Sequence, residues 1–477
     1  MSSSTTAAHR WIALTGLLAA EAMNLLDATI VQVAAPVVHA SLSGPATDIQ
    51  WFSAAYALAL AMVLITGGRL GDLYGRKRIF IIGVTCFVLT SAACALSTSD
   101  VMLIALRVVQ GGAAGLIIPQ TFGLIRAMFD GPELPKALGC IGPVMGLASV
   151  CGPIIGGFLT HADLFGSSWR SVFLVNVPLG IAVLLLARFL PEDRAPGPVR
   201  LDLPGTALAM VGAGLVMYPL IEANWSAPVL AELVAGVAVL AGFAWQQRRG
   251  AQRGRDSLIT VSLFSSRGFV AALVCLALFF AVLNGLMLVV VLQLQLGLHA
   301  DVLTASLSLL PWSIGMGMSA LLAGRYLYPR YGANIVFAGL GLLLAGIVGA
   351  MAAPTGYPWP LLGALGVAGL GVGLFTTPLF TVALHNVRPH ETGSAAGLLN
   401  AVQELGATLG VAVLGTTFLQ GSARHAFAVA AGLVVLTGIS AAVMVRGARR
   451  RSGNAQSADA DESDAVESVA SDSVLLD

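Results

Sequence analysis

Four ionisable side chains lie inside long apolar stretches of this sequence: Glu21, Asp27, Arg107 and Glu404. An ionised group in a lipid environment costs about 3 kcal/mol or more, so such residues are functional candidates by default. A carboxyl group can gain and lose a proton, and a fixed cation beside it stabilises the ionised form. Together these groups have the chemistry that proton or ion coupling requires.

The two acids of the first apolar stretch are predicted to have different roles. At about 1.5 Å per residue from Trp11, Glu21 lies about 15 Å along a helix and Asp27 about 24 Å along it. Six residues subtend roughly 240°, so the two side chains are expected to point in different directions. For both acids the alternative is a structural role, as a hydrogen-bonded group near the outer end for Asp27 and as a buried acid for Glu21.

Arg107 and Glu404 also leave two interpretations open. Arg107 either pairs with a carboxylate or bonds to backbone carbonyl groups. Glu404 either adds a second acid to a cavity or donates a hydrogen bond to another helix as a protonated carboxyl. Uncharged polar residues in other apolar stretches are predicted to line a substrate cavity suited to amphiphilic ligands. These residues are Asn24, Gln110, Gln120, Asn284 and Gln293.

Composition indicates which elements must position these groups. The chain has 477 residues, of which 57% are hydrophobic and 10% are charged, with a mean hydropathy of +0.86. This is too little charge to cover a soluble protein of that size. We therefore predict an all-α integral membrane protein. Apolar runs long enough to cross a bilayer give fourteen candidate transmembrane helices: 11–36, 49–67, 79–97, 101–123, 136–160, 170–190, 203–222, 227–246, 268–297, 303–324, 333–353, 358–385, 395–420 and 424–446.

The basic residues predict the orientation of these helices. With the N-terminus inside, nearly all of the 25 lysine and arginine residues fall in inner segments, apart from Arg170, Arg424 and the intramembrane Arg107. The excess of positive charge on the inner side places both termini in the cytoplasm of a multi-pass protein of the bacterial cytoplasmic membrane.

The fourteen spans are predicted to form two six-helix pseudo-symmetric bundles plus two inserted helices. Residues 1–10 form a cytoplasmic N-terminus, 11–190 the first bundle and 191–246 a linker with the inserted pair. Residues 247–267 form a cytoplasmic loop, 268–446 the second bundle and 447–477 an acidic tail that is expected to be disordered. Residues 324–332 repeat the glycine and arginine pattern of 68–78, which supports an internal repeat.

Two segments combine glycine with features that suggest conformational roles. In 68–78, Asp72 lies among basic residues and is predicted to accept hydrogen bonds that lock a loop against helix ends. This candidate latch comprises Gly68, Asp72, Gly75, Arg76, Lys77 and Arg78. In the fifth span, small residues at helical spacing and a proline favour close helix packing with a kink, and Gly142 and Gly146 extend the pattern. The residues of this second motif are Gly152, Pro153, Gly156 and Gly157.

These segments resemble the major facilitator superfamily, in particular its fourteen-helix drug:proton antiporter branch. The resemblance rests on 26–36, on 68–78, on Arg107 to Gly112, on 152–157 and on 169–178. It implies that Asp27, with Arg107, couples protons and that the loop at 68–78 is a conformational latch. It also links the fifth-span motif to antiport. Gln32, Ala35 and Glu404 depart from the usual pattern, which carries Asn, Leu and Gln at these places.

The predicted function is proton-coupled antiport that exports lipophilic drugs or antibiotics, with cationic compounds among the candidates. The alternative is export of one endogenous metabolite or siderophore. The scattered histidines show no metal spacing, and no phosphate-binding loop for ATP occurs, so a membrane enzyme and an ATP-driven pump are disfavoured. The expected partners are a small lipophilic substrate, protons and lipid. No cofactor, metal or nucleic acid is expected, and the protein is expected to be a monomer.

Overall fold

The computed structural model describes residues 7–131, 133–163, 166–194, 202–222, 226–253, 261–353, 358–385, 387 and 392–447. Within these ranges all regular secondary structure is helical. Helices are expected because every backbone N–H and C=O must find a partner within the segment when lipid surrounds it. The predicted disordered tail after 447 and parts of the predicted linker and cytoplasmic loop lie outside the described residues.

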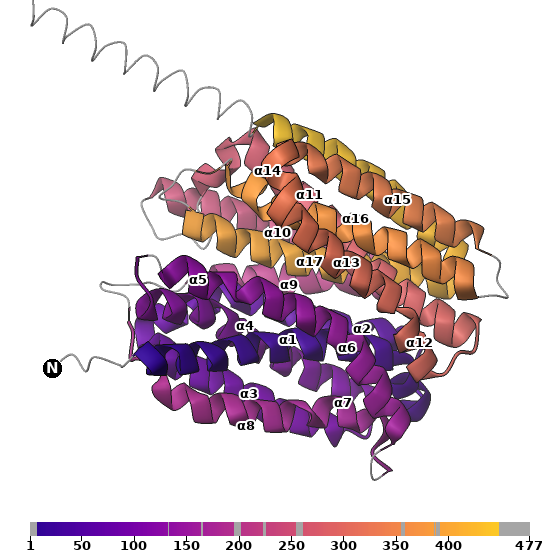
Figure 1. Ribbon diagram of the computed structural model, residues 1–477, viewed down its shortest axis with the longest axis horizontal. Helices are drawn as coiled ribbons and strands as arrows, with labels where there is room; N and C mark the ends of the chain where they lie inside the picture. Colours follow the sequence, from indigo (N-terminus) through magenta and orange to yellow (C-terminus); the bar gives the residue numbers. More distant parts are fainter. Residues whose placement is uncertain are drawn as a thin grey trace, which may run out of the picture.

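The first group of helices spans the N-terminal part of the chain (Figure 1). Its core contains the buried rings of Phe80 and Phe87. Its members are α1 (Ala7–Leu42), α2 (Asp48–Tyr74), α3 (Arg76–Ala95), α4 (Asp100–Met128), α5 (Glu133–Gly139), α6 (Ile141–Ala162), α7 (Ser171–Leu174) and α8 (Asn176–Leu186).

The second group has a separate core, in which the rings of Phe279 and Phe375 lie 4.2 Å apart between centroids. The chain closes this group with a helix at Ala423–Gly447. The other members are α11 (Arg267–Leu292), α12 (Val302–Ser308), α13 (Leu310–Leu322), α14 (Tyr328–Tyr331), α15 (Ile335–Ala352), α16 (Pro358–His385) and α17 (Thr392–Gln420). We call the two groups the first and second bundles.

The helices of the second bundle slope toward the first bundle and meet it at the end opposite the N-terminus (Figure 1). We call this the far end, and the end at which α1 begins the near end. Hydrogen bonds between the bundles lie in the far half of the molecule. Gln50 Nε2 lies 3.4 Å from Thr416 Oγ1, and Gln295 Nε2 donates to the Val33 carbonyl at 2.8 Å. The far end is therefore closed by polar contacts across the interface.

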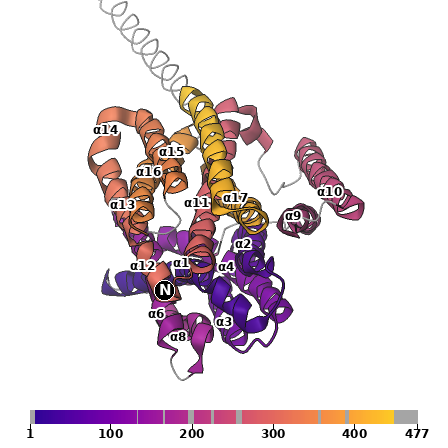
Figure 2. The same ribbon diagram turned by 90° about the vertical axis from the view of Figure 1, so that its right-hand side faces the viewer.

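The helices α9 (Leu203–Glu222) and α10 (Ala227–Gln252) form a hairpin at the side of the two bundles (Figure 2). Helix α9 contacts both α2 and α17, whereas α10 packs on α9. Thr416 Oγ1 of α17 donates to the carbonyls of Leu220 and Ile221 at 3.0 and 3.2 Å, and Trp51 Nε1 of α2 donates to Glu222 at 3.3 Å. Helix α9 of the inserted pair thus lies across the line, here called the seam, along which α2 of the first bundle meets α17 of the second.

Twelve helices of the described residues are long and apolar enough to cross a membrane, or up to 13 if the bent helix α2 counts as one. The prediction of an all-helical membrane protein is confirmed, and its count of fourteen is left unconfirmed by this test. One of the twelve stretches, Val302–Ala352, has 51 residues and contains the turn at Gly332, where φ is 58°.

Candidate functional site

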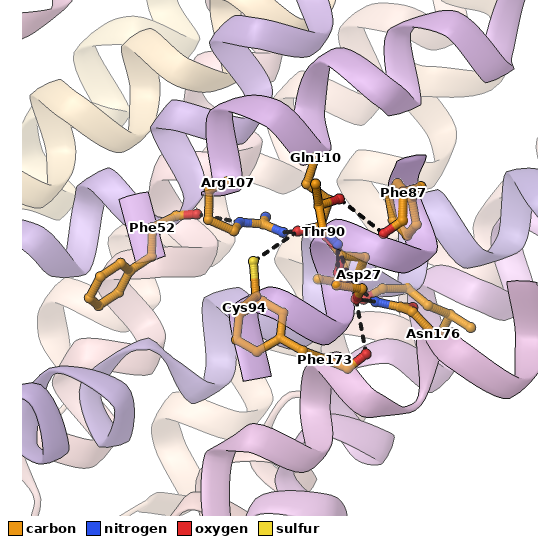
Figure 3. Close-up of polar contacts among 12 residues, drawn as sticks. Asp27, Phe52, Phe87, Thr90, Cys94, Arg107, Gln110, Phe173 and Asn176 are labelled. Carbon is orange, nitrogen blue, oxygen red and sulfur yellow. Dashed lines mark hydrogen bonds and ion pairs between the residues drawn. The ribbon is translucent and has the colours of Figure 1, made fainter. Parts of the chain in front are cut away.

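Asp27 lies at the centre of a hydrogen-bonded assembly inside the first bundle (Figure 3). Its side chain is fully buried, with 0% exposure. Oδ2 accepts a hydrogen bond from Arg107 Nη1 at 2.5 Å, and Oδ1 accepts from Gln110 Nε2 at 3.0 Å and Asn176 Nδ2 at 2.7 Å. Helices α4 and α8 therefore bring three donors to the carboxylate on α1.

Arg107 makes both of the contacts that the sequence left open, one with a carboxylate and one with a backbone carbonyl. Its guanidinium pairs with Asp27, and its Nε donates to the carbonyl of Phe52 at 2.9 Å. Nη1 also donates to Gln110 Oε1 at 2.8 Å, whereas Nη2 has no partner among the described residues. A buried charge is stable only when it is paired and hydrogen-bonded, and this pair meets that condition.

Ser91 of α3 accepts hydrogen bonds from the same two side-chain amides, of Gln110 and Asn176, that bond to Asp27. Its Oγ donates to the Phe173 carbonyl at 2.9 Å and accepts from Gln110 Nε2 at 3.2 Å and Asn176 Nδ2 at 3.0 Å. Because each amide is bonded to both Asp27 and Ser91, its orientation is fixed. Asn176 opens α8, and the sequence offered a signal for it, a polar residue before a proline in an otherwise apolar run.

Glu21 lies deeper toward the near end and is nearly fully buried. It lies beside Thr121 of α4, and its Oε1 has no partner among the described residues. Glu21 and Asp27 both approach α4, at positions a few turns apart along it. Both amide atoms of Asn24 are also buried without a partner in the described chain.

The structure separates the residues that were expected to line one cavity. Gln110 belongs to the Asp27 assembly, and Gln120 donates to the Gly67 carbonyl at 2.7 Å between α4 and α2. Asn284 Oδ1 accepts from Gln32 of the first bundle at 3.4 Å, and Gln293 lies against Gly297 at the end of α11. Of this set, Asn284 lies at the interface between the bundles.

Glu404 is half-buried on α17 beside Gln403, whose Nε2 donates to it at 3.2 Å. It lies within electrostatic range of Tyr56 on α2, as does Glu21. Tyr56 is a buried residue that the sequence analysis did not select. Its ring covers the Arg107 guanidinium, with 4.3 Å between Cζ and the ring centroid.

The predicted latch forms an ion-pair network at the near end. Arg76 donates to Asp72 at 2.8 Å through Nη2 and to Asp193 at 2.5 Å through Nη1. The Arg76 backbone N–H also donates to the Asp193 carbonyl at 2.9 Å. Gly75, between α2 and α3, has a φ of 100°, which favours glycine. The network ties the α2–α3 turn to the segment that follows α8, and Lys77 lies 3.5 Å from Glu192 of the same segment.

The glycine motif of α6 packs against two neighbours. A side chain at Gly152 would collide with Thr29 of α1, and one at Gly157 would collide with Ser306 of α12. One at Gly156 would press tightly against Ile30 of α1. Helix α6 is continuous through Pro153 and joins the first bundle to the second at this point. The extension of the pattern to Gly142 and Gly146 was wrong as a packing prediction, because nothing lies within 4 Å of a Cβ at either position.

Among the described residues, no group of three or more histidine, cysteine, aspartate or glutamate side chains could hold a metal ion. The candidate site consists of a buried carboxylate, its cation and two amide donors.

A family profile described as Major Facilitator Superfamily matches residues 17–411. The chain belongs to this superfamily. Members of this superfamily are membrane transporters and not enzymes, and the same holds for this multi-pass protein. The resemblance seen in the sequence motifs is confirmed.

Its relatives include antibiotic and drug exporters. The chain is 43% identical over 421 residues to a "Probable actinorhodin transporter" of Streptomyces coelicolor, which covers 86% of this chain and 73% of the relative. It is 34% identical to a "Puromycin resistance protein" of Streptomyces alboniger, with 87% and 83% of the two chains covered. It is 32% identical to the "Multidrug resistance protein Stp" of Mycobacterium tuberculosis, with 83% and 73% covered.

Solved structures of other transporters share the fold. A bacterial homologue of the human lysosomal transporter Spinster, in an inward-facing and unoccupied conformation, aligns with a TM-score of 0.65 at 17% identity, covering 93% of this chain and 98% of that one. A structure described for proton-dependent oligopeptide transporters also gives 0.65, at 18% identity, covering 93% and 100%.

Proposed function

We propose that this protein is a proton-coupled antiporter that exports lipophilic antibiotic-type compounds across the bacterial cytoplasmic membrane. The observation that carries the proposal is the Asp27–Arg107 pair, which is fully buried and whose two carboxylate oxygens both accept hydrogen bonds. A buried ion pair of this kind contributes little net stability compared with apolar packing. Its retention inside a lipid-embedded bundle is therefore better explained by a functional role in charge movement.

The names of the relatives support the export of antibiotics. Several of them are named for antibiotics or drug resistance, which supports a lipophilic small-molecule substrate. Buried polar atoms at Glu21 and Asn24 would orient such a ligand within mainly apolar walls. A second candidate is export of a single endogenous metabolite, because the relative at 43% identity is named for one compound.

We infer fourteen crossings with the near end in the cytoplasm. The 51-residue stretch Val302–Ala352 would be about 76 Å long as one helix, more than twice the thickness of the hydrocarbon core, and it turns at Gly332. It therefore supplies two crossings. The basic residues gather at the near end, which favours that side as the cytoplasmic one. The contacts at the far end then close the outer face, so the state described here is one that loads substrate from the cytoplasm.

The energy source in this proposal is the proton gradient, with a monomer as the working unit and no cofactor. The test is export from proteoliposomes with an imposed pH gradient, using a substrate identified in a resistance screen of an efflux-deficient bacterium. Asp27→Asn keeps the size of the side chain but carries no exchangeable carboxyl proton. It should abolish gradient-driven export while substrate binding in detergent persists. Full gradient-driven export by Asp27→Asn would refute the coupling role.

The roles of Glu21 and Glu404 are tested in the same vesicles. Each carboxylate discriminates charge strongly where the dielectric is low. Glu21→Gln and Glu404→Gln should therefore weaken export of a cationic substrate more than that of a neutral one. Equal losses for the two substrates would rule out a role in charge selection.

A further inference from the structure

Tyr56 lies at the border between the Asp27 assembly and the second bundle. One face of its ring lies over Arg107, 4.3 Å from Cζ. Its hydroxyl has no hydrogen-bond partner among the described residues, and the side chain is within electrostatic range of Glu404 on α17. The residue is only 2% exposed. The ring therefore separates the guanidinium from the interface that α2 forms with α17.

The close packing of α2 on α4 places the backbone of Tyr56 beside α4. A side chain at Gly111 would collide with the backbone of Tyr56, so glycine allows the two helices to approach closely at this point. Phe52 lies one helical turn before Tyr56 on α2, and its carbonyl accepts from Arg107 Nε at 2.9 Å. Helix α2 thus holds Arg107 twice, through a backbone carbonyl and through an aromatic face.

The hydrogen bonds of Asp27 set a condition for proton exchange. Its Oδ2 accepts from Arg107, and its Oδ1 accepts from Gln110 and Asn176. These three donors occupy three of the roughly four lone-pair sites of the carboxylate. Because Asp27 is also fully buried, a proton from solvent can reach it only when the groups around it move. Gln110 and Asn176 are also held by Ser91, whereas Arg107 has one guanidinium nitrogen without a partner in the described chain. Arg107 Nη1 is the donor on Oδ2, so displacement of the guanidinium would open this oxygen to a proton.

We propose that the Tyr56 ring is the gate of the Asp27–Arg107 pair. The ring holds the guanidinium on the carboxylate and shields both from the interface between the bundles. Asp27 takes up a proton from solvent only when the ring moves away, and Arg107 keeps its charge throughout. Tyr56 is a positioning residue, because it acts through Arg107. The inference rests on the proposed function in its use of Asp27 as the proton carrier, whereas the position of the ring does not depend on it.

The first test measures proton leak in proteoliposomes that contain no substrate. With an imposed pH gradient and an internal pH dye, Tyr56→Leu and Tyr56→Met should raise proton flux roughly tenfold, the population change expected from loss of a desolvated cation–π contact. Tyr56→Phe and Tyr56→Trp keep an aromatic ring and should retain the wild-type flux. Tyr218→Leu is the matched control, since this tyrosine of α9 is 45% exposed and its ring lies near Trp51.

The second test does not depend on protons. Cys94 is fully buried beside the pair, with its thiol 3.8 Å from Gln110 Oε1. In a variant without the other four cysteines, a small methanethiosulfonate reagent should modify Cys94 faster after Tyr56→Leu or Tyr56→Met, and at the wild-type rate after Tyr56→Phe. Monodisperse elution in detergent confirms folding.

The proposal is overturned if the folded leucine and methionine variants keep the wild-type flux, or if the phenylalanine variant leaks as they do. Failure of the proposed function is distinguishable from this result. If Asp27→Asn still exports substrate with the gradient, Asp27 is not the proton carrier, yet the Cys94 reaction still shows whether the ring shields the pair.

Discussion

Asn176 donates a hydrogen bond of 2.7 Å to the Oδ1 of Asp27, although the two residues are 149 positions apart in the sequence. This contact joins the first helix of the bundle to the start of α8. The same amide group also donates to Ser91 at 3.0 Å, so one side chain connects three helices.

Removing this amide should destabilise the first bundle. Asn176→Ala leaves the buried Asp27 with one donor fewer, which we expect to cost about 1 to 3 kcal/mol. Thermal unfolding in detergent should show a lower midpoint. Asn284→Ala serves as the comparison, because its contact with Gln32 is longer, at 3.4 Å, and only partly buried. Equal unfolding midpoints for the wild type and Asn176→Ala would show that the hydrogen bonds of Asn176 to Asp27 and Ser91 do not stabilise the first bundle.

The buried ion pair predicts non-additive effects on stability. Asp27→Asn alone leaves the guanidinium of Arg107 uncompensated, and breaking a buried pair in this way costs about 3 to 5 kcal/mol. Arg107→Gln alone should have a comparable cost. The double variant Asp27→Asn/Arg107→Gln buries no charge, so its midpoint should fall by less than the sum of the two single changes. Simple additivity would show that the two groups do not interact as the structure indicates.

The latch network predicts that Asp193 and Asp72 act together. Both carboxylates bind Arg76, so Asp193→Asn and Asp72→Asn should each slow transport while substrate affinity in detergent stays within a few-fold. Glu192→Gln is the matched control, because Glu192 is 78% exposed and its 3.5 Å pair with Lys77 is a surface contact of little energy. A large loss of affinity with unchanged transport kinetics would assign Asp72 to binding instead.

The far end predicts a conformational effect of Thr416. Thr416→Val removes the hydroxyl that contacts Gln50 and the carbonyls of α9, so the far end should open more often. Spin labels at the exposed Ser43 and Ser422 would report longer distances. Thr417→Val is the control, since its hydroxyl donates to Val413 of its own helix at 2.7 Å. Unchanged distances in Thr416→Val would show that this contact does not hold the far end closed.

Topology is tested by labelling cysteines from outside intact cells, in a background without native cysteines. Arg253 follows α10 at the near end and is exposed, so Arg253→Cys should be protected from an impermeant maleimide. Ser43→Cys, at the far end, should react. Labelling at residue 253 would refute the fourteen-crossing layout with cytoplasmic termini.

The sequence predicted the helices well because their signal is local. Apolar length and the positions of glycine and arginine are properties of single segments, and the predicted 79–97 and 101–123 lie close to α3 and α4. The sequence also singled out Asp27 and Arg107, and the structure places their side chains in contact.

The remainder of the site depends on contacts that no single segment encodes. Tyr56 looks like an ordinary residue of an apolar helix until α2 packs on α4 and places its ring over Arg107. Asp193 looked like part of a polar linker, yet it completes the latch with Arg76. At Gly142 the sequence predicted too much, because the regular spacing of glycines indicated a packing interface and the fold places no neighbouring atom within 4 Å of a Cβ there.

The position of α9 across the seam constrains how the transporter can move. Thr206 of α9 lies 2.9 Å from Thr66 of the first bundle, and Ile221 of the same helix accepts from Thr416 of the second bundle. If the bundles separate at the far end to release substrate, a rigid α9 cannot keep both contacts. In that case the hairpin moves with one bundle and slides over the other, so that its contact with Thr66 or its contact with Thr416 breaks and re-forms in each cycle.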